Sequence, residues 1–404
     1  MPDSKPNGGV EYLIPKEIMF FNAPMFRSSV GDTDYTLKLM AGLNRAGVSC
    51  SSYEHTKRET WVKRLVINML GDRRHDPIIH LQLRPPGTGA WFDNKSIEGK
   101  GIGYIVTVHE FSGLTSDQHR IKVLDYIQAA DHVIFTTAAE RDAVVGYMPN
   151  LAERSSIIPV FPTIQCSYPT PEKIDRPNNV LWFGTIRGGK GIPEIIKFAY
   201  LIGQDEELKG KTKIIVVGTP LNPVDLSLLL RTAYGLKRAD MPAIGHDRDT
   251  ANNKLAVMLA DFKKTGREPI SPIEIHLSVN EKDLPQYFDQ CNFAYLPITR
   301  GANSNSAVLP VVMGNGCVTI SKRGLDTPVA LESGGVLFAQ TPGEALTIIK
   351  ERIKNPDLNI ETRSKANEYV RSIALENAVR EHVTIYSSLS LNKELGAKMD
   401  VLKS

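Results

Sequence analysis

A short polar segment between two apolar stretches has the residue types that could hold a phosphate. Residues 300–306 read RGANSNS, follow the apolar run 293–296 and precede a stretch compatible with a helix, 307–313. Small side chains let an anion approach the backbone, hydroxyl and amide groups can donate to it, and the first turn of a helix adds free N–H groups and a positive dipole end. Asn and Ser are equally ordinary helix N-caps. The predicted diphosphate-binding residues here are Arg300, Ala302, Asn303, Ser304, Asn305 and Ser306.

A second segment, 184–191, is rich in glycine and also carries positive charge. It reads GTIRGGKG and lies between the apolar run 180–183 and a helix with a proline near its start, 193–202. Glycines permit close approach of the backbone, and a lysine supplies a point charge for phosphate. The GxxxxGK[ST] spacing of a P-loop is absent. The segment is either a second phosphate-binding loop, with Gly184, Arg187 and Lys190 as its binding residues, or a flexible surface loop.

Candidate catalytic side chains occur in the first half of the chain. The apolar run 103–108 ends at His109-Glu110, and Asp32 and Asp34 belong to the small-residue loop that follows a predicted strand at 16–22. Residues just beyond the carboxyl ends of strands are where doubly wound sheets place their chemistry. A lone histidine in a fold of this size is also compatible with a purely structural role.

These segments belong to a regular alternation of strands and helices, which predicts an α/β fold with two Rossmann-like, doubly wound domains. Residues 162–179 contain several prolines and have no apolar periodicity, as linkers do. We therefore expect an N-terminal domain at 1–165, a linker at 166–179, a second domain at 180–375, and a C-terminal helical segment at 376–404 that could return to the N-terminal domain. The expected strands are residues 16–22, 76–83, 103–108, 131–136, 157–161, 180–183, 213–218, 273–277, 293–296, 317–321 and 336–338.

Composition limits the classes of function. The 404 residues carry a net charge of +3 and are 42% hydrophobic and 23% charged, which is ordinary for a soluble globular protein. No basic stretch is interleaved with aromatic residues, so nucleic acid is not an expected partner. The four cysteines are widely spaced, which predicts neither a zinc site nor a disulfide framework and favours a reducing cytoplasm.

The N-terminus and the hydropathy pattern bear on localisation. Residues 1–9 are polar and unlike a signal peptide, and no apolar run approaches the roughly 18 residues that a membrane span requires. The segment from Lys57 to Arg74 mixes basic and apolar residues. It is either a basic amphipathic helix that contacts anionic lipid or a surface helix that packs on the sheet. We expect a cytoplasmic protein, with peripheral attachment to the inner face of the membrane as an option.

The second half resembles the donor-binding domain of GT-B glycosyltransferases, most closely that of glycosyltransferase family 4. VLWFGTIRGGKG is similar to the family's strand and G-R-x-x-x-x-K-G loop, with Gly184, Lys190 and Gly191 in register. AVLPVVMGNGCVTIS resembles its E-A-M-A-x-G helix and next strand. In the first half the likeness comprises Gly31, for a glycine loop, VTVHE, for the strand that ends at an active-site histidine, and AADHVIFTTAAER, for the strand before the linker.

This resemblance implies two domains that face each other across a cleft and a nucleoside-diphosphate sugar as substrate, with no metal and no other cofactor. By the likeness, Lys190 and backbone N–H groups from Ala302 to Ser306 bind the donor diphosphate, and His109 faces the donor sugar. The implied acceptor is a glycan, a glycolipid or another hydroxyl compound. If the segment from Lys57 to Arg74 binds lipid, the acceptor could be a lipid-linked glycan.

The sequence departs from the family at two places. The paired glutamates, eight positions apart, fall on Asn303 and Val311; the amide can hydrogen-bond a sugar hydroxyl, but the valine cannot accept a hydrogen bond from a ribose. The arginine that follows the strand glycine falls on Thr185, and Arg187 or Arg300 could replace it because a guanidinium on a neighbouring loop can still reach a diphosphate oxygen.

Sugar transfer from a diphosphate needs stabilisation of the leaving group, which preorganised cations supply without a metal. If the reaction inverts configuration, the base is one of Glu110, Asp32, Asp34 and His109; if it retains configuration, His109 holds the sugar. Two other functions share this architecture: a catalytically silent GT-B partner subunit, which the missing glutamates favour, and a sugar-nucleotide epimerase, which would need more acidic and histidine residues. A periplasmic binding protein would be expected to carry a signal peptide.

Overall fold

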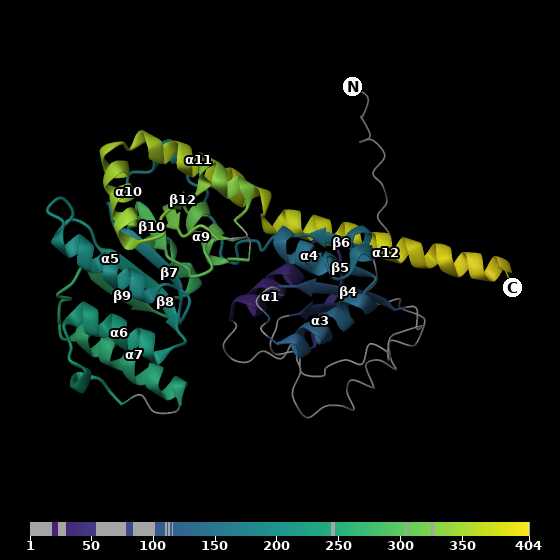
Figure 1. Cartoon of the computed structure of the whole chain (residues 1–404), viewed down its shortest axis with the longest axis horizontal. Coiled ribbons are helices and arrows are strands. Elements are labelled where there is room, and N and C mark those ends of the chain that lie inside the picture. The colour runs from purple at the N-terminus through teal and green to yellow at the C-terminus, as the bar shows by residue number, and fades with distance from the viewer. Residues whose placement is uncertain are drawn as a thin grey trace, which may run out of the picture. The chain divides into compact units, whose positions relative to one another are not determined.

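The computed structural model describes residues 18–22, 30–53, 78–83, 102–109, 111, 114, 116–243, 247–303, 305–324 and 327–403. The chain divides into two compact units (Figure 1). Unit 1 comprises Met1–Phe161 together with Ile373–Ser404, and unit 2 comprises Pro162–Ser372. By this division the proline-rich segment 166–179 belongs to unit 2, and the C-terminal helix belongs to unit 1.

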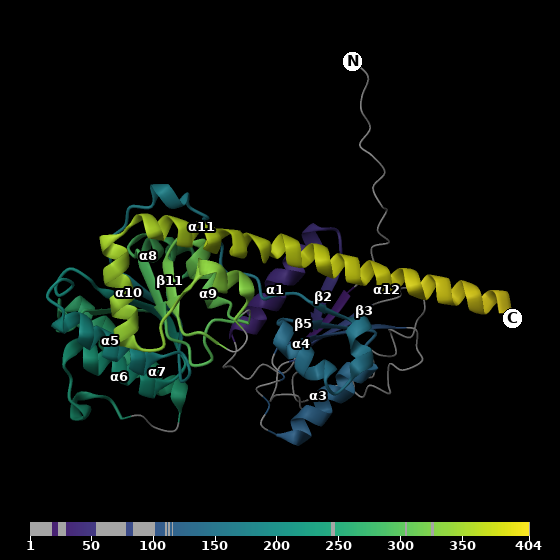
Figure 2. The same cartoon turned by 45° about the horizontal axis from the view of Figure 1, so that its top comes forward.

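Unit 1 is built on a six-stranded parallel sheet with the order β2-β1-β3-β4-β5-β6. Every residue of β3 and β4 is buried, because helices cover the sheet and parallel strands between them are hidden on both faces. The C-terminal helix α12 packs beside α1 (Figure 2). The strands are β1 (Ile18–Asn22), β2 (Cys50–Tyr53), β3 (Ile78–Leu83), β4 (Gly103–Val108), β5 (His132–Phe135) and β6 (Ser155–Ile157), and the helices are α1 (Val30–Arg45), α3 (Asp117–Ala129), α4 (Ala138–Val145) and α12 (Leu375–Lys403).

Unit 2 has a second six-stranded parallel sheet, in the order β12-β11-β10-β7-β8-β9. This is the strand order of dinucleotide-binding folds, in which the first and fourth strands of the domain lie side by side at the centre. The strands are β7 (Val180–Ile186), β8 (Ile214–Pro220), β9 (Ile273–Leu277), β10 (Phe293–Leu296), β11 (Val318–Ser321) and β12 (Leu337–Phe338), and the helices are α5 (Ile192–Gln204), α6 (Pro223–Tyr234), α7 (Arg248–Lys264), α8 (Pro285–Asp289), α9 (Val308–Gly314), α10 (Pro342–Lys354) and α11 (Asp357–Ser372).

The core of unit 2 lies between this sheet and its helices. The apolar side of α5 packs on the central strands, where the rings of Phe198 and Tyr295 meet at 5.0 Å between centroids. Trp182 on β7 is only 1% exposed and belongs to the same cluster. This packing anchors the two central strands whose carboxyl ends form the candidate site.

The observed strands differ from the predicted ones in several places. The strand expected at 157–161 is found at Ser155–Ile157, because Pro159 has no N–H group to continue the ladder. Strand β7 runs on to Ile186, paired with β8, so Gly184 and Thr185 are strand residues rather than loop residues. The strand β2 was not expected, since its sequence CSSY has no apolar alternation.

The proline-rich segment is held on unit 2 by polar contacts. The N–H of Tyr168 donates to the carbonyl of Gly314 at 2.8 Å, and the guanidinium of Arg176 lies 2.7 Å from the carboxylate of Asp289. The side-chain amide of Asn367 on α11 donates to the carbonyl of Pro169 at 3.2 Å. Such contacts explain why this segment packs in place although it has no apolar face.

Among the helices that the structure describes, none combines the length and the apolar composition that crossing a bilayer requires. The segment from Lys57 to Arg74, predicted either to contact lipid or to pack on the sheet, lies outside the described residues.

Candidate functional site

Two loops of unit 2 meet where the central strands β7 and β10 end. Residues 187–191 follow β7, and residues 297–307 follow β10. The backbone N–H of Thr299 donates to the carbonyl of Gly189 at 3.0 Å, which joins the two loops. Because the chain leaves these neighbouring strands toward opposite sides of the sheet, their carboxyl ends form the switch point at which such sheets bind ligands. The structure thus brings together the two loops that were predicted to bind a diphosphate.

The first loop is held to the core and to the second loop through its backbone. The indole Nε1–H of Trp182 donates to the carbonyl of Lys190 at 3.1 Å. Gly191 has φ = 78°, and a Cβ at this position would lie 2.3 Å from the carbonyl oxygen of Pro297. Only glycine fits this close approach in a left-handed conformation. Gly184 also has a positive φ of 138°, and its Cα faces Val308 at the start of α9, which a Cβ would approach to 3.4 Å.

The joined loops carry three cationic residues on adjacent segments. Arg187 and Lys190 follow β7 and are partly exposed, whereas Arg300 follows β10 and is exposed. Two guanidinium groups and one ammonium group on these two loops carry the sign of charge that binds a diphosphate. These are the cations that the sequence predicted for the donor site.

The backbone of the second loop is largely occupied by bonds within the chain. The N–H of Ala302 donates to the carbonyl of Lys322 at 2.8 Å. The N–H of Asn305 donates to Oδ1 of Asn303 at 3.1 Å, and that of Ser306 donates to the carbonyl of Asn303 at 3.2 Å. In this conformation these three N–H groups, which the sequence had assigned to the diphosphate, already have acceptors within the chain. Ser304 lies outside the described residues.

Helix α9 adds little to an anion site. It is seven residues long, and its third residue, Pro310, has no N–H. The N–H of Leu309 already donates to Oγ of Ser306 at 3.3 Å, so this serine, one residue before the N-cap Ala307, satisfies an N–H of the first turn. Val311, at the position of the second family glutamate, is buried with 1% exposure and packs in the core. The ordinary capping interpretation of Ser306 therefore describes this structure better than phosphate binding by the helix end does.

Sequence reasoning missed an ion pair at this edge of the sheet. Lys322 follows β11 directly, and its Nζ lies 2.8 Å from Oε1 of Glu194 in the first turn of α5. Burial by itself would raise the pKa of Glu194, but the hydrogen bond and the charge of Lys322 outweigh it, so the pKa lies below its usual value. The available signal was position, because Lys322 comes directly after a predicted strand and thus at the same carboxyl edge as the two loops.

A third loop, after β11, packs against the loop after β10. Gly301 has φ = 75°, and a Cβ there would lie 2.3 Å from the backbone nitrogen of Gly324. The hydroxyl of Thr327 donates to the carbonyl of Ala302 at 2.8 Å. The three loops are thereby fixed to one another, as preorganised binding of a charged ligand requires.

In unit 1, His109 lies directly after β4 and is 8% exposed. Its Nε2 is 2.7 Å from Oε1 of Gln82, and the ring of Tyr35 meets its ring edge-on at 5.4 Å. Gly31 and Asp32 belong to the first turn of α1, which begins at Val30, so the loop predicted to extend to Asp34 is shorter than expected. Glu110 and the side chain of Asp32 lie outside the described parts of the structure.

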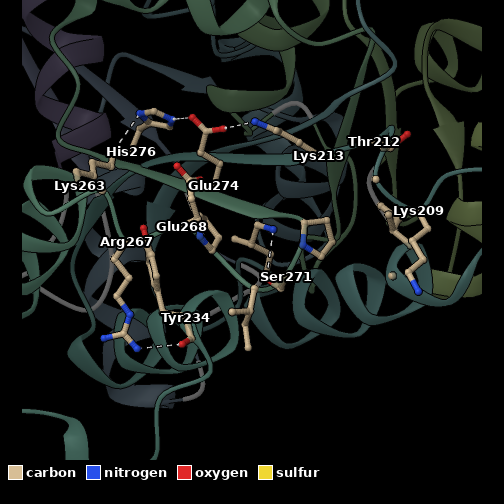
Figure 3. A pocket seen from close by; sticks show the side chains of 18 residues that line it. Lys209, Thr212, Lys213, Tyr234, Lys263, Arg267, Glu268, Ser271, Glu274 and His276 are labelled. Atoms are coloured by element: carbon tan, nitrogen blue, oxygen red, sulfur yellow. Dashed lines mark hydrogen bonds and ion pairs between the residues drawn. The ribbon is translucent and has the colours of Figure 1, made fainter.

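A pocket of about 760 Å³ lies elsewhere in unit 2 (Figure 3). It is lined by residues at the beginnings of β8 and β9 and at the end of α7, which is the edge of the sheet opposite the switch point. Glu274 pairs there with His276 at 2.8 Å and with Lys213 at 3.4 Å. The hydrogen bond from His276, followed by these charges, lowers the pKa of Glu274 to about 2. The pocket lies at the other edge of the sheet and is not part of the site at the strand ends.

No protein-family model matches the sequence, and no curated protein matches it. Solved structures do match. A glycosyltransferase from Rickettsia africae is 11% identical, with 93% of this chain and 98% of that chain covered and a TM-score of 0.61. Sucrose-phosphate synthase from Thermosynechococcus elongatus is 12% identical, with 93% and 100% covered and a TM-score of 0.61. HepE from Anabaena in complex with UDP is 13% identical, with 92% and 100% covered and a TM-score of 0.59.

At identities this low the likeness concerns the fold. Each match extends over nearly the whole of both chains, and so over both sheets. The chain therefore has the α/β fold of two Rossmann-like, doubly wound domains that is known as GT-B and that these structures share.

Proposed function

We propose that the protein is a glycosyltransferase that moves a sugar from a nucleoside-diphosphate sugar to a hydroxyl acceptor. The observation that carries the proposal is the hydrogen bond between Thr299 and Gly189, because it brings the loops of Lys190 and Arg300 together at the switch point of unit 2. As the glycosidic bond of the donor breaks, negative charge builds on the diphosphate. Cations held in fixed loops stabilise that charge in the transition state.

The fold supports this assignment. The structures that match include a glycosyltransferase from Rickettsia africae, and another of them, Anabaena HepE, was solved with UDP. Because two guanidinium groups and an ammonium group can balance the charge of a diphosphate, we further propose that transfer needs no metal and no other cofactor.

The proposed roles follow from where the residues lie. Lys190, with Arg187 or Arg300, binds the diphosphate, and the amide of Asn303 binds a sugar hydroxyl. His109 contacts the donor sugar or acts as the base, and the other candidate bases are Asp32 and Glu110. The proposed acceptor is a glycan or a lipid-linked glycan. In the latter case the segment from Lys57 to Arg74 would attach a cytoplasmic protein to the membrane surface.

A second candidate, a catalytically silent GT-B partner subunit, also has an observation in its favour. Three N–H groups of the loop after β10 already have acceptors in the chain, and Val311 is buried where the family has a glutamate. A protein that kept the fold and lost donor binding would show these features. The two candidates differ in whether the protein binds a nucleotide.

The test is a thermal-shift titration of the purified chain with UDP, GDP, ADP, TDP and CMP, each with and without EDTA. A ligand that binds only the folded state stabilises it by about 2.7 kcal/mol at a concentration of 100 Kd. We expect one nucleoside diphosphate to raise the Tm and EDTA to leave the shift unchanged. No shift with any nucleotide would reject the transferase and favour the silent subunit, and a shift abolished by EDTA would reject metal independence.

A matched pair of variants locates the binding. Lys190→Ala should remove the shift, whereas Lys209→Ala should retain it, because Lys209 is an exposed lysine of the same unit that lines the pocket at the opposite edge of the sheet. Retention of the shift in Lys190→Ala would place the nucleotide elsewhere.

A further inference from the structure

A row of polar side chains is buried inside unit 1. His80 and Gln82 are two residues apart on β3, and Thr107 and His109 are two residues apart at the end of β4. Side chains at such spacing lie on one face of a sheet, and Gln82 and Thr107 are direct partners in the register of the two strands. None of the four is more than 8% exposed. Buried polar groups need partners, and these groups find them in one another.

The contacts form a continuous series of hydrogen bonds that begins on the C-terminal helix. Oη of Tyr386, on α12, lies 2.7 Å from Nδ1 of His80, and this tyrosine is fully buried. Nε2 of His80 lies 2.7 Å from Oγ1 of Thr107 and 3.2 Å from the amide nitrogen of Gln82. The amide oxygen of Gln82 lies 2.7 Å from Nε2 of His109. This series of hydrogen bonds thus connects Tyr386 on α12 to His109, which follows β4.

The positions of the protons follow from the chemistry of the groups. Burial, with smaller contributions from neighbouring histidines, lowers the pKa of His80 well below its usual value, so its ring is neutral and has one donor and one acceptor nitrogen. The amide nitrogen of Gln82 can only donate, which makes Nε2 of His80 the acceptor. Nδ1 of His80 therefore carries the proton and donates to the hydroxyl oxygen of Tyr386.

The same reasoning fixes the next group. With its nitrogen directed at His80, the amide of Gln82 presents its oxygen to His109. An amide oxygen only accepts, so Nε2 of His109 must carry a proton. We propose that Gln82, oriented through His80 by Tyr386 and Thr107, is a positioning residue that holds His109 in the Nε2–H tautomer.

This inference rests on the proposed function only where it assigns His109 a role in sugar transfer; the tautomer itself does not depend on that function. In this tautomer Nδ1 is the acceptor nitrogen of the ring, so any group that bonds to Nδ1 must be a donor. The orientation of the ring is supported from the other side by Tyr35, which stacks on Phe161 at 4.5 Å and meets His109 edge-on. Within unit 1, the C-terminal helix therefore supports the position of His109 through Tyr386, although the two residues are far apart in the sequence.

The test reads the tautomer directly and needs no activity. The full chain is labelled with ¹⁵N-histidine, and the long-range ¹H–¹⁵N spectrum is recorded at neutral pH, where each tautomer gives its own pattern of nitrogen shifts. The signal of His109 is assigned by its loss in His109→Gln. We expect the Nε2–H pattern in the wild-type protein. The Nδ1–H pattern would overturn the proposal, because it requires the opposite orientation of the amide.

Variants test whether Gln82 is the cause. Gln82→Met removes the acceptor at similar size and should change the His109 pattern to a mixture of tautomers, whereas Gln82→Glu keeps an oxygen acceptor and should preserve Nε2–H. His382→Asn is the matched control, since the ring of His382 lies 5.7 Å from that of His80 and Nδ1 of His382 donates to the carbonyl of Ala378 outside the chain of contacts. It should leave the His109 pattern unchanged.

The outcomes separate this inference from the proposed function. A His109 pattern that is unchanged in Gln82→Met would contradict a positioning role for Gln82. The same would follow if His382→Asn changed the His109 pattern as much as Gln82→Met does. If Gln82→Met does not fold, the wild-type tautomer and Gln82→Glu still decide the question. The nucleotide titration tests unit 2 and fails or succeeds independently of the tautomer in unit 1.

Discussion

The N–H of Thr299 donates to the carbonyl of Gly189 at 3.0 Å, and this bond makes one surface out of two loops that are far apart in the sequence. Beside it, Gly191 lies against the carbonyl of Pro297 with no room for a side chain. The loops therefore pack backbone to backbone. The positions of Lys190 and Arg300 depend on this packing, which makes the junction itself a target for substitution.

Gly191→Ala should disrupt the junction. An added Cβ would lie 2.3 Å from the carbonyl oxygen of Pro297, at a residue with φ = 78°. Left-handed strain and the clash together should lower the free energy of unfolding by about 2 to 4 kcal/mol. Urea denaturation measures the loss. Gly188→Ala is the control, because nothing lies within 4 Å of its added Cβ, and its stability should be unchanged or slightly higher. Equal stability of both variants would contradict the close packing of the loops.

Lys190→Ala should abolish sugar transfer and leave the fold intact. Lys190 is partly exposed, and its carbonyl, not its side chain, accepts the bond from Trp182, so removal of the ammonium group leaves this anchor in place. The unfolding free energy should change by less than about 0.5 kcal/mol. Circular dichroism checks the fold, and hydrolysis or transfer of a radiolabelled donor, chosen by the titration, checks the activity. Undiminished turnover in this variant would remove Lys190 from the donor site.

The pair of Lys322 and Glu194 should show measurable coupling. Their side chains are 18% and 26% exposed and 2.8 Å apart, so the interaction is less screened than that of a surface pair. A double-mutant cycle with Lys322→Met and Glu194→Gln should give a coupling energy of about 1 kcal/mol. The exposed pair of Lys365 and Glu361, 38% and 65% exposed, provides the comparison and should give less than about 0.5 kcal/mol. Coupling no larger than in the exposed pair would show that the contact does not hold α5 to the loop after β11.

The free energy of unfolding of unit 1 should decrease in mild acid because of the lowered pKa of His382. Burial lowers its pKa from 6.5 to about 4, while the unfolded chain keeps the ordinary value. Between these values the unfolded state binds more protons, so stability is fully present above about pH 6.5 and falls as the pH decreases toward 4. The loss between pH 7 and pH 5 should be about 2 kcal/mol from this residue, and the lowered pKa of His80 acts in the same direction.

His382→Asn tests this assignment. In the wild-type protein Nδ1 of His382 donates to the carbonyl of Ala378 at 2.7 Å. The asparagine amide can donate to the same carbonyl but does not titrate. Denaturation curves at pH 7 and pH 5 should show a pH dependence smaller by about 2 kcal/mol in the variant than in the wild type. The same dependence in both proteins would mean that another group controls acid stability.

Local features of the chain were predicted well from the sequence. The strands Gly103–Val108, Ile273–Leu277 and Phe293–Leu296 have the expected bounds. Each of these predictions depends on a short apolar run, so the information lies within the segment itself. The alternation of such segments was enough to predict the α/β fold with two doubly wound domains.

The candidate site was predicted only in part. The two loops of unit 2 and their cations were identifiable because each follows a recognisable strand, and the strand order then brings them together. The sequence could not show that the N–H groups of the loop after β10 are already used, since one of their acceptors, the carbonyl of Lys322, belongs to a different strand end. It also could not decide between capping and phosphate binding for Ser306.

By itself, then, the sequence determined the order of the strands and helices and the residues that stand at the strand ends, because these are set by contacts between near neighbours in the chain. The tertiary structure alone decided which of those residues meet. Lys322 pairs with Glu194 across 128 positions, and Tyr386 reaches His80 across 306. Such partners are chosen by how sheets and helices pack to bury apolar surface, and no local pattern in the sequence records that choice.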